Sequence, residues 1–188
     1  MGALQVALLN GSYNDSMTTE NFRRDVDADV NPFAVDRGVP VLGVCFGHQL
    51  VADVLGGEVE PMGEYELGYR EVEVEPGASS VLLDGLADRF VAFSTHSDEV
   101  TALPPDTTVT ASNDYSIQGF RRGDAFGVQF HPEYDRASAE RVTRGKDLPE
   151  ERVRHVLEGI TDESVAAATD AKIVFDNFLE YARRRSET

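Results

Sequence analysis

The chain has 188 residues, of which 41% are apolar, so it can bury the core of one domain of ordinary size. It carries 34 acidic against 17 basic residues, a net charge of −17, and this balance argues against unaided binding to nucleic acid. Its apolar runs are far shorter than the roughly 18 residues of a membrane span, and no basic region precedes an apolar signal, so we expect a cytoplasmic protein that binds no membrane.

The acidic residues are spread along the whole chain, and only two of the basic residues are lysines, Lys146 and Lys172. An acidic surface depleted of lysine resembles the surfaces of proteins from organisms with high cytoplasmic salt, where screening suppresses self-repulsion. The composition therefore predicts a halophilic protein. Since no repeat or low-complexity stretch interrupts it, we expect a single domain over residues 1–188.

The first predicted elements are a strand over Leu4–Leu9 and a helix over Thr18–Val26. The next apolar run begins at Val39 and ends at Cys45, the only cysteine, with Gly43 and Gly47 on either side. This pattern is typical of a nucleophile elbow, in which a buried strand turns sharply into a helix and leaves a reactive side chain on the turn.

The helix after this elbow should bury Leu50, Val51, Val54 and Leu55. A thiol at the N-terminus of a helix is accessible and is favoured as the thiolate. A thiolate nucleophile normally needs a base and a group that orients the base.

The second half of the chain supplies both groups. A strand is predicted over Phe126–Phe130, and His131, Pro132 and Glu133 follow it. Pro132 should end the strand and hold the local backbone rigid, so that the histidine and the carboxylate leave one turn together. One cysteine excludes an internal disulfide, and a lone histidine–carboxylate pair lacks a third ligand, so we expect no metal and no other cofactor.

The last part of the chain contains two further helix candidates. The first covers Pro149–Glu158, with Val153, Val156 and Leu157 facing inward and His155 on the surface. The second covers Asp170–Arg185, and its terminal arginines suit the helix dipole.

The two motifs G-V-C-F-G-H-Q and G-V-Q-F-H-P-E, in this order, resemble those of class I glutamine amidotransferases. The resemblance implies that Cys45 attacks the side-chain amide of glutamine, that His131 is the general base and acid, and that Glu133 orients the imidazole. Phe93–Val100 is similar to the S-H-x-D-x-V stretch of the glutaminase domain of GMP synthase, and Glu64–Tyr69 is similar to the E-I-G-W element of stand-alone members. The residues that these matches predict to bind substrate are Phe46, Gln49, Gly68, Ser94, Thr95 and His96.

The chain departs from the family at two places. The second strand and the glycine-rich oxyanion loop are missing between about 30 and 36, since Asp27–Gly38 is too short to hold them. Either this is a true deletion, which would impair catalysis, or a stretch is absent from the printed sequence; we favour the second, because Asn31–Arg37 resembles two ends of a longer segment. The other departure is an insertion at about 136–169, which could cover the pocket, contact a partner or decorate the surface.

The resemblance implies an α/β fold, a three-layer sandwich with a central, mostly parallel sheet of the flavodoxin-like kind. It implies a glutaminase that supplies ammonia to a separate synthase, since the chain has no phosphate-binding loop of the G-x-x-x-x-G-K-[ST] type. One alternative is a gamma-glutamyl peptidase that uses the same triad on a gamma-glutamyl compound. Another is a non-catalytic homologue with a binding or regulatory role. The sequence indicates no oligomeric state.

Overall fold

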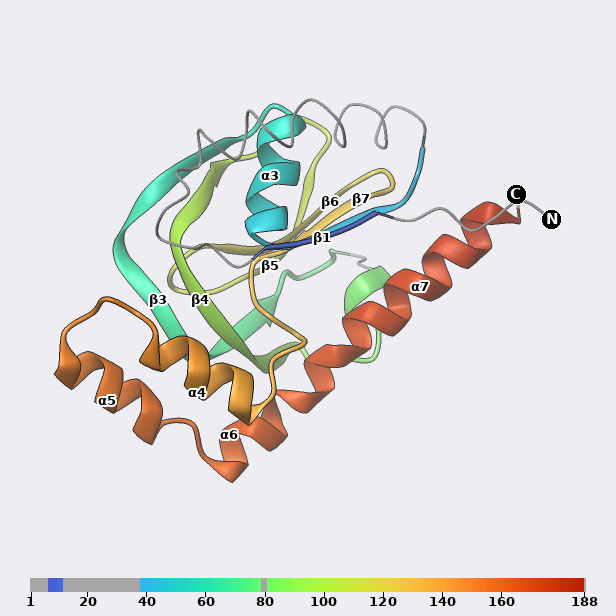
Figure 1. The fold of residues 1–188 in the computed structure, drawn as a ribbon. Helices are drawn as coiled ribbons and strands as arrows, with labels where there is room; N and C mark the ends of the chain where they lie inside the picture. The colour runs from blue at the N-terminus through green and yellow to red at the C-terminus, as the bar shows by residue number, and fades with distance from the viewer. Residues whose placement is uncertain (1–6, 12–37, 79–80, 188) are drawn as a thin grey trace.

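The computed structural model describes residues 7–11, 38–78 and 81–187, and for 7–11 the backbone alone. Within these residues, seven strands form one sheet in the order β1-β2-β7-β6-β5-β3-β4 (Figure 1). The strands are β1 Ala7–Gly11, β2 Val41–Cys45, β3 Glu58–Val74, β4 Arg89–Ala102, β5 Thr108–Ser112, β6 Ile117–Arg122 and β7 Ala125–Val128.

The sheet is mixed, so the expectation of a mostly parallel sheet is wrong. Within the described residues, β2 runs parallel to its neighbours β1 and β7, while the other four neighbouring pairs are antiparallel. The reason lies in the connections. Short turns link β5 to β6 and β6 to β7, and a tight turn can join only antiparallel strands, since a parallel pair needs a long crossover. The α/β class itself is confirmed.

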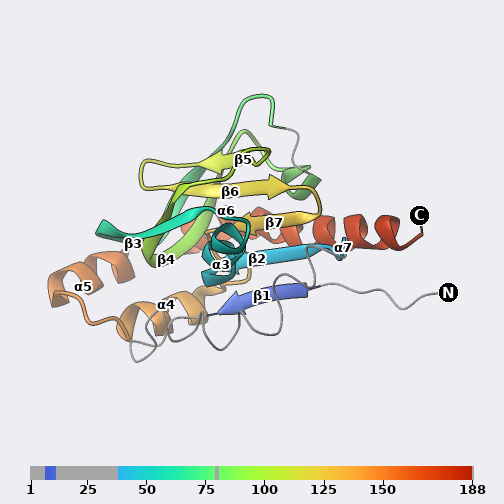
Figure 2. The same cartoon turned by 90° about the horizontal axis from the view of Figure 1, so that it is seen from above.

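Helices cover both faces of the sheet. Figures 1 and 2 show α3 against one face and α7 along the other. A further group, α4 to α6, lies beside β3 and β4 (Figure 1). The helices are α3 Phe46–Val54, α4 Arg136–Arg144, α5 Glu150–Glu158, α6 Asp162–Ala167 and α7 Ile173–Ser186, with short 3-10 turns η1 Val81–Leu83 and η2 Thr169–Lys172.

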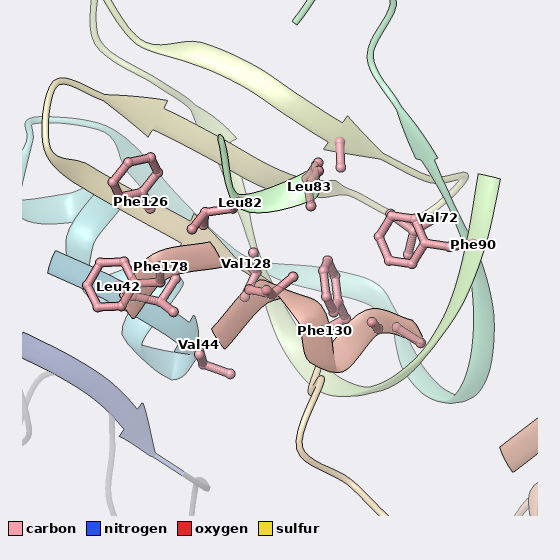
Figure 3. Close-up of a cluster of buried hydrophobic side chains, with 14 of the residues drawn as sticks. Leu42, Val44, Val72, Leu82, Leu83, Phe90, Phe126, Val128, Phe130 and Phe178 are labelled. Atoms are coloured by element: carbon pink, nitrogen blue, oxygen red, sulfur yellow. The ribbon is translucent and has the colours of Figure 1, made fainter. Parts of the chain in front are cut away.

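The described residues form three apolar cores, and two of them result from the alternation of side chains along the strands. In β2, Leu42 and Val44 point toward α7, whereas Val41 points toward α3. Phe178 of α7 meets Phe126 of β7 edge to face in the larger core, where aromatic and branched side chains interlock (Figure 3). These layers hold the ends of β2 and β7 rigidly side by side.

The described elements follow the sequence predictions closely. The elbow helix begins at Phe46 and buries Leu50 and Val51, while Val54 and Leu55 are half-buried. The predicted helix α5 buries Val156 and exposes His155, and the closing helix begins at Ile173 after a 3-10 turn. Predictions on residues 4–6, 12–37 and the supposed loop deletion lie outside the described residues. In the part of the chain that the structure describes, no helix is long and apolar enough to cross a membrane.

Candidate active site

Cys45 occupies a sharp turn between β2 and α3. Its φ of 53° and ψ of −104° are unusual for a residue with a side chain, as expected for a nucleophile elbow. The turn requires Gly43, because a Cβ there would lie 2.2 Å from the carbonyl oxygen of Gly47. The side chain of Cys45 thus stands at the N-terminus of α3, where the backbone N–H of Phe46 donates a hydrogen bond to it.

His131 is held from two directions. Its backbone N–H donates to the carbonyl of Phe93 in β4 at 2.8 Å, and its ring stacks on Tyr134 with centroids 4.2 Å apart. Its Nδ1 lies 2.8 Å from Oε1 of Glu133, a side chain that is 29% exposed. The Glu133 carboxylate therefore fixes the ring orientation and leaves Nε2 for Cys45.

Cys45 and His131 shift each other's pKa through their charges and a hydrogen bond. Burial alone would raise the pKa of the Cys45 thiol, but the charge and hydrogen bond of His131, with a smaller effect of His96, bring it below its ordinary value. Burial alone would lower the pKa of His131, but Cys45 and Glu133 raise it to about 10. The two shifts favour the thiolate of Cys45 and the imidazolium of His131.

A chain of two amides reaches the sulfur from the opposite side. The side-chain amide of Gln49 donates to the carbonyl of Asp98 at 2.8 Å and to Oε1 of Gln129 at 3.2 Å. Gln129 in turn directs its amide N–H at Sγ of Cys45, 3.6 Å away. The sequence prediction missed Gln129, although it stands inside the second motif, because a glutamine on a strand carries no signal of its own.

A second histidine–carboxylate pair lies on β3 and β4. Nε2 of His96 is 2.6 Å from Oε2 of Glu66, and both side chains are almost fully buried, at 2% and 0% exposure. Nδ1 of His96 faces the carbonyl of Asp98 at 2.9 Å, so both ring nitrogens face acceptors. Burial lowers the pKa of His96, but the hydrogen bond and charge of Glu66 outweigh it and raise the pKa above its ordinary value. His96 therefore keeps its second proton to a higher pH than an ordinary histidine.

Glu66 is saturated with donors. Asn113 donates to its Oε1 at 2.7 Å, and Gln118 donates to its Oε2 at 3.1 Å. Hydrogen bonds of this kind stabilise a buried carboxylate. Glu66 belongs to the Glu64–Tyr69 stretch that resembles the E-I-G-W element, but no role was predicted for it.

One pocket lies over Cys45, and most predicted residues line it. Phe46, Gln49, Thr95 and His96 contribute to its wall together with Cys45 and His131. The residues of the wall that the sequence prediction missed are Tyr65, Ser97, Asp98, Tyr134, Val142 and Lys146.

Two of the predicted substrate-binding residues lie outside this wall. Gly68 and Ser94 face each other across β3 and β4, and a Cβ on Gly68 would contact Val156 of α5. Gly68 has a φ of 111°, so a glycine is favoured there for the backbone rather than for the pocket. Within the described residues, no group of three or more His, Cys, Asp and Glu side chains is placed to hold a metal ion.

This geometry can be compared with known proteins. The family model described as "Glutamine amidotransferase class-I" matches residues 5–143, which include Cys45, His131 and Glu133. The chain belongs to the class I glutamine amidotransferase family. The match ends within α4, so the later helices lie beyond it.

Curated relatives of this amidotransferase domain are larger proteins. The GMP synthase [glutamine-hydrolyzing] of Cronobacter sakazakii is 35% identical over 182 residues, which cover 91% of this chain and 31% of the relative. That of Edwardsiella ictaluri is 43% identical over 112 residues, 54% of this chain and 21% of the relative. The chain thus spans less than a third of the length of these relatives.

Solved structures agree with the fold. A glutamine amidotransferase from Thermotoga maritima superposes with a TM-score of 0.74 at 25% identity, covering 93% of this chain and 78% of that one. A glutamine amido transferase from Methylobacillus flagellatus gives a TM-score of 0.66 at 22% identity and covers 79% of this chain and 65% of that chain. The second likeness concerns the fold alone.

Proposed function

We propose that this class I amidotransferase domain hydrolyses glutamine through a glutamyl thioester on Cys45. The observation that carries the proposal is the ordered series Cys45, His131 and Glu133, in which His131 interacts with the Cys45 sulfur and places its Nδ1 2.8 Å from a carboxylate oxygen of Glu133. This series opens onto a pocket, and it combines the nucleophile, the proton carrier and the orienting group of acyl transfer.

The reaction begins with attack of the Cys45 sulfur on the side-chain amide carbon of glutamine. A C–S bond forms, and the carbonyl electrons move to oxygen, so that negative charge develops there. The backbone N–H of Phe46, the residue after the nucleophile, lines the pocket and is our candidate donor to this oxyanion. A second donor would come from the segment before Gly38, outside the described residues.

His131 moves the protons. Its imidazolium donates a proton to the amide nitrogen as the C–N bond breaks, and ammonia leaves. The neutral imidazole then takes a proton from water, whose hydroxide attacks the thioester and releases glutamate and the Cys45 thiolate. Glu133 stabilises the imidazolium at both stages, since it lies 2.8 Å from Nδ1.

The ammonia is proposed to serve a synthase. The GMP synthases that resemble this chain match it over less than a third of their length. We therefore propose that residues 1–188 are the glutamine-hydrolysing part and that the acceptor of the ammonia binds outside them, on the same polypeptide or on a partner.

Ammonia release from glutamine tests the proposal. Wild type, Cys45→Ala and the exposed control Lys172→Met should be compared in molar potassium chloride, because a net charge of −17 requires screening. We expect release that depends on Cys45 and not on Lys172. Faster turnover of gamma-glutamyl peptides than of glutamine would instead favour a peptidase, and release that persists in Cys45→Ala would contradict the mechanism.

A further inference from the structure

The inserted segment after Glu133 reaches the active-site pocket. Val142 of α4 and Lys146, just after that helix, both line the pocket that holds Cys45. The segment is anchored on β3, because Val156 packs in a common core with Leu67 and the guanidinium of Arg152 donates to the carbonyl of Tyr65. Lys146 therefore belongs to a segment that packs on β3 and forms part of the pocket wall.

The ammonium of Lys146 has a defined place in that wall. It lies 5.1 Å from the centre of the Tyr65 ring, a cation–π contact. The Tyr65 hydroxyl is 3.1 Å from Oγ1 of Thr95, and the carbonyl oxygen of Thr95 is 3.8 Å from Sγ of Cys45. A continuous series of contacts thus connects the lysine with the nucleophile.

Lys146 differs from the other cations of the pocket in its charge balance. His131 has Glu133 as its carboxylate, and His96 has Glu66. Among the described residues, no Asp or Glu oxygen lies within ion-pairing distance of the Lys146 ammonium. The Lys146 ammonium can therefore bind an external anion, although the chain has 34 acidic residues and only two lysines.

Resting on the function proposed above, we propose that Lys146 is a specificity-determining residue that binds the α-carboxylate of the glutamyl substrate. The reacting amide lies at one end of that substrate, and a carboxylate and an ammonium lie at the other. Lys146 supplies the cation for the α-carboxylate, and Asp98 lines the same pocket as an anion for the α-ammonium. Lys146 thereby selects glutamine or gamma-glutamyl compounds whose α-carboxylate is free.

Covalent labelling of Cys45 tests this without turnover. The probes are 6-diazo-5-oxo-L-norleucine, which carries a free α-carboxylate, its methyl ester, and iodoacetamide. Lys146→Met keeps an apolar stem over Tyr65 but removes the charge, Lys146→Arg restores a cation, and Lys172→Met makes the same change in net charge at an exposed site. Each variant is first checked for an unchanged melting temperature.

We expect Lys146→Met to slow labelling by the free acid about 10- to 100-fold, the range for one charged hydrogen bond. Labelling by the ester and by iodoacetamide should stay within about twofold, Lys146→Arg should recover most of the loss, and Lys172→Met should behave as wild type. Equal slowing of acid and ester, no slowing, or a wild type that the acid does not label would overturn the proposal. Acid-selective labelling without glutamine turnover would keep it and reject the glutaminase.

Discussion

Two histidine–carboxylate pairs stand at one pocket, and they differ in burial and in their hydrogen-bond partners. His131 and Glu133 share a turn after β7, and the carboxylate is 29% exposed. His96 and Glu66 lie within the β3–β4 ladder, and they are enclosed by one further acceptor, the Asp98 carbonyl, and by two donors, the side chains of Asn113 and Gln118. His131 also interacts with the Cys45 thiol. The other hydrogen-bond partners of His96 and Glu66 are the backbone and amide groups named above.

The difference suggests a division of roles. A ring whose second nitrogen meets the nucleophile can give up and take back a proton during each turnover. A ring whose two nitrogens both face fixed acceptors favours the doubly protonated, charged form and has no reacting group with which to exchange a proton. In this view His131 is the proton carrier, and His96 is a positioning residue that supports the Cys45 thiolate and the β3–β4 frame.

Replacement of His131 should produce the largest effect on activity. We expect His131→Gln to lower kcat/KM for glutamine by about 10⁴-fold or more, because the proton carrier is lost. His155→Gln changes an exposed histidine of α5 and should leave kcat/KM within about twofold. Steady-state ammonia assays measure both variants. A loss in kcat/KM below about tenfold in His131→Gln would show that His131 is not the proton carrier.

Glu66→Gln should mainly reduce stability. It leaves the buried His96 without its anion, and breaking a buried ion pair typically costs about 3–5 kcal/mol of the free energy of unfolding. The exposed Glu64→Gln makes the same charge change on β3 and should cost less than about 1 kcal/mol. Urea titrations at constant salt measure both, and equal losses would contradict the assignment.

The loss in Glu66→Gln should also depend on pH. Since Glu66 raises the pKa of His96 in the folded protein, the pair stabilises fully below the ordinary histidine value of 6.5. That contribution disappears as pH rises through the higher folded value. The gap between wild type and Glu66→Gln should therefore be widest below pH 6.5 and should narrow in alkaline buffer, and a gap that widens with pH would reverse this picture.

The reactivity of Cys45 should be governed by the first pair more than by the second. In wild type, iodoacetamide should react at neutral pH, since His131 holds the pKa of Cys45 below its ordinary value. His131→Gln should slow this reaction at pH 7 by about 10- to 100-fold, because the thiol pKa rises when the charge and hydrogen bond of His131 are lost. His96→Gln should shift the pH profile of Cys45 alkylation by less. A larger shift than in His131→Gln would mean that His96, and not His131, governs the pKa of Cys45.

Gln129→Leu should have the smallest effect of the series. It removes one N–H donor 3.6 Å from the sulfur, and a hydrogen bond of this kind contributes about 1 kcal/mol, equivalent to about fivefold in the alkylation rate at neutral pH. Gln129→Glu should slow alkylation further, because it places an anion beside the thiolate. A rate in Gln129→Glu above that of wild type would show that this contact is structural only.

Local sequence predicted the elements that carry the first pair. The glycines around Cys45 and the proline after His131 act through the backbone of their own segment, so their effect is visible in a few residues. The mixed character of the sheet was not predicted, because the order of strands depends on pairing between distant segments.

The pairing of Glu66 with His96 and the place of Lys146 were missed for a related reason. Glu66 and His96 are 30 positions apart and meet only through the register of β3 and β4. Lys146 reaches the pocket because α5 docks on β3, a contact that no local pattern encodes. Charge in a sequence shows which groups exist, and tertiary packing decides which of them face one another.

The most direct measurement is detection of the glutamyl thioester on Cys45. Wild type would be mixed with isotopically labelled glutamine in molar potassium chloride, quenched in acid within one turnover and mapped by peptide mass spectrometry. The account predicts a labelled glutamyl adduct on the peptide that contains Cys45, and none in Cys45→Ala. Ammonia release from wild type without any adduct on that peptide, at matching rates in Cys45→Ala, would contradict it.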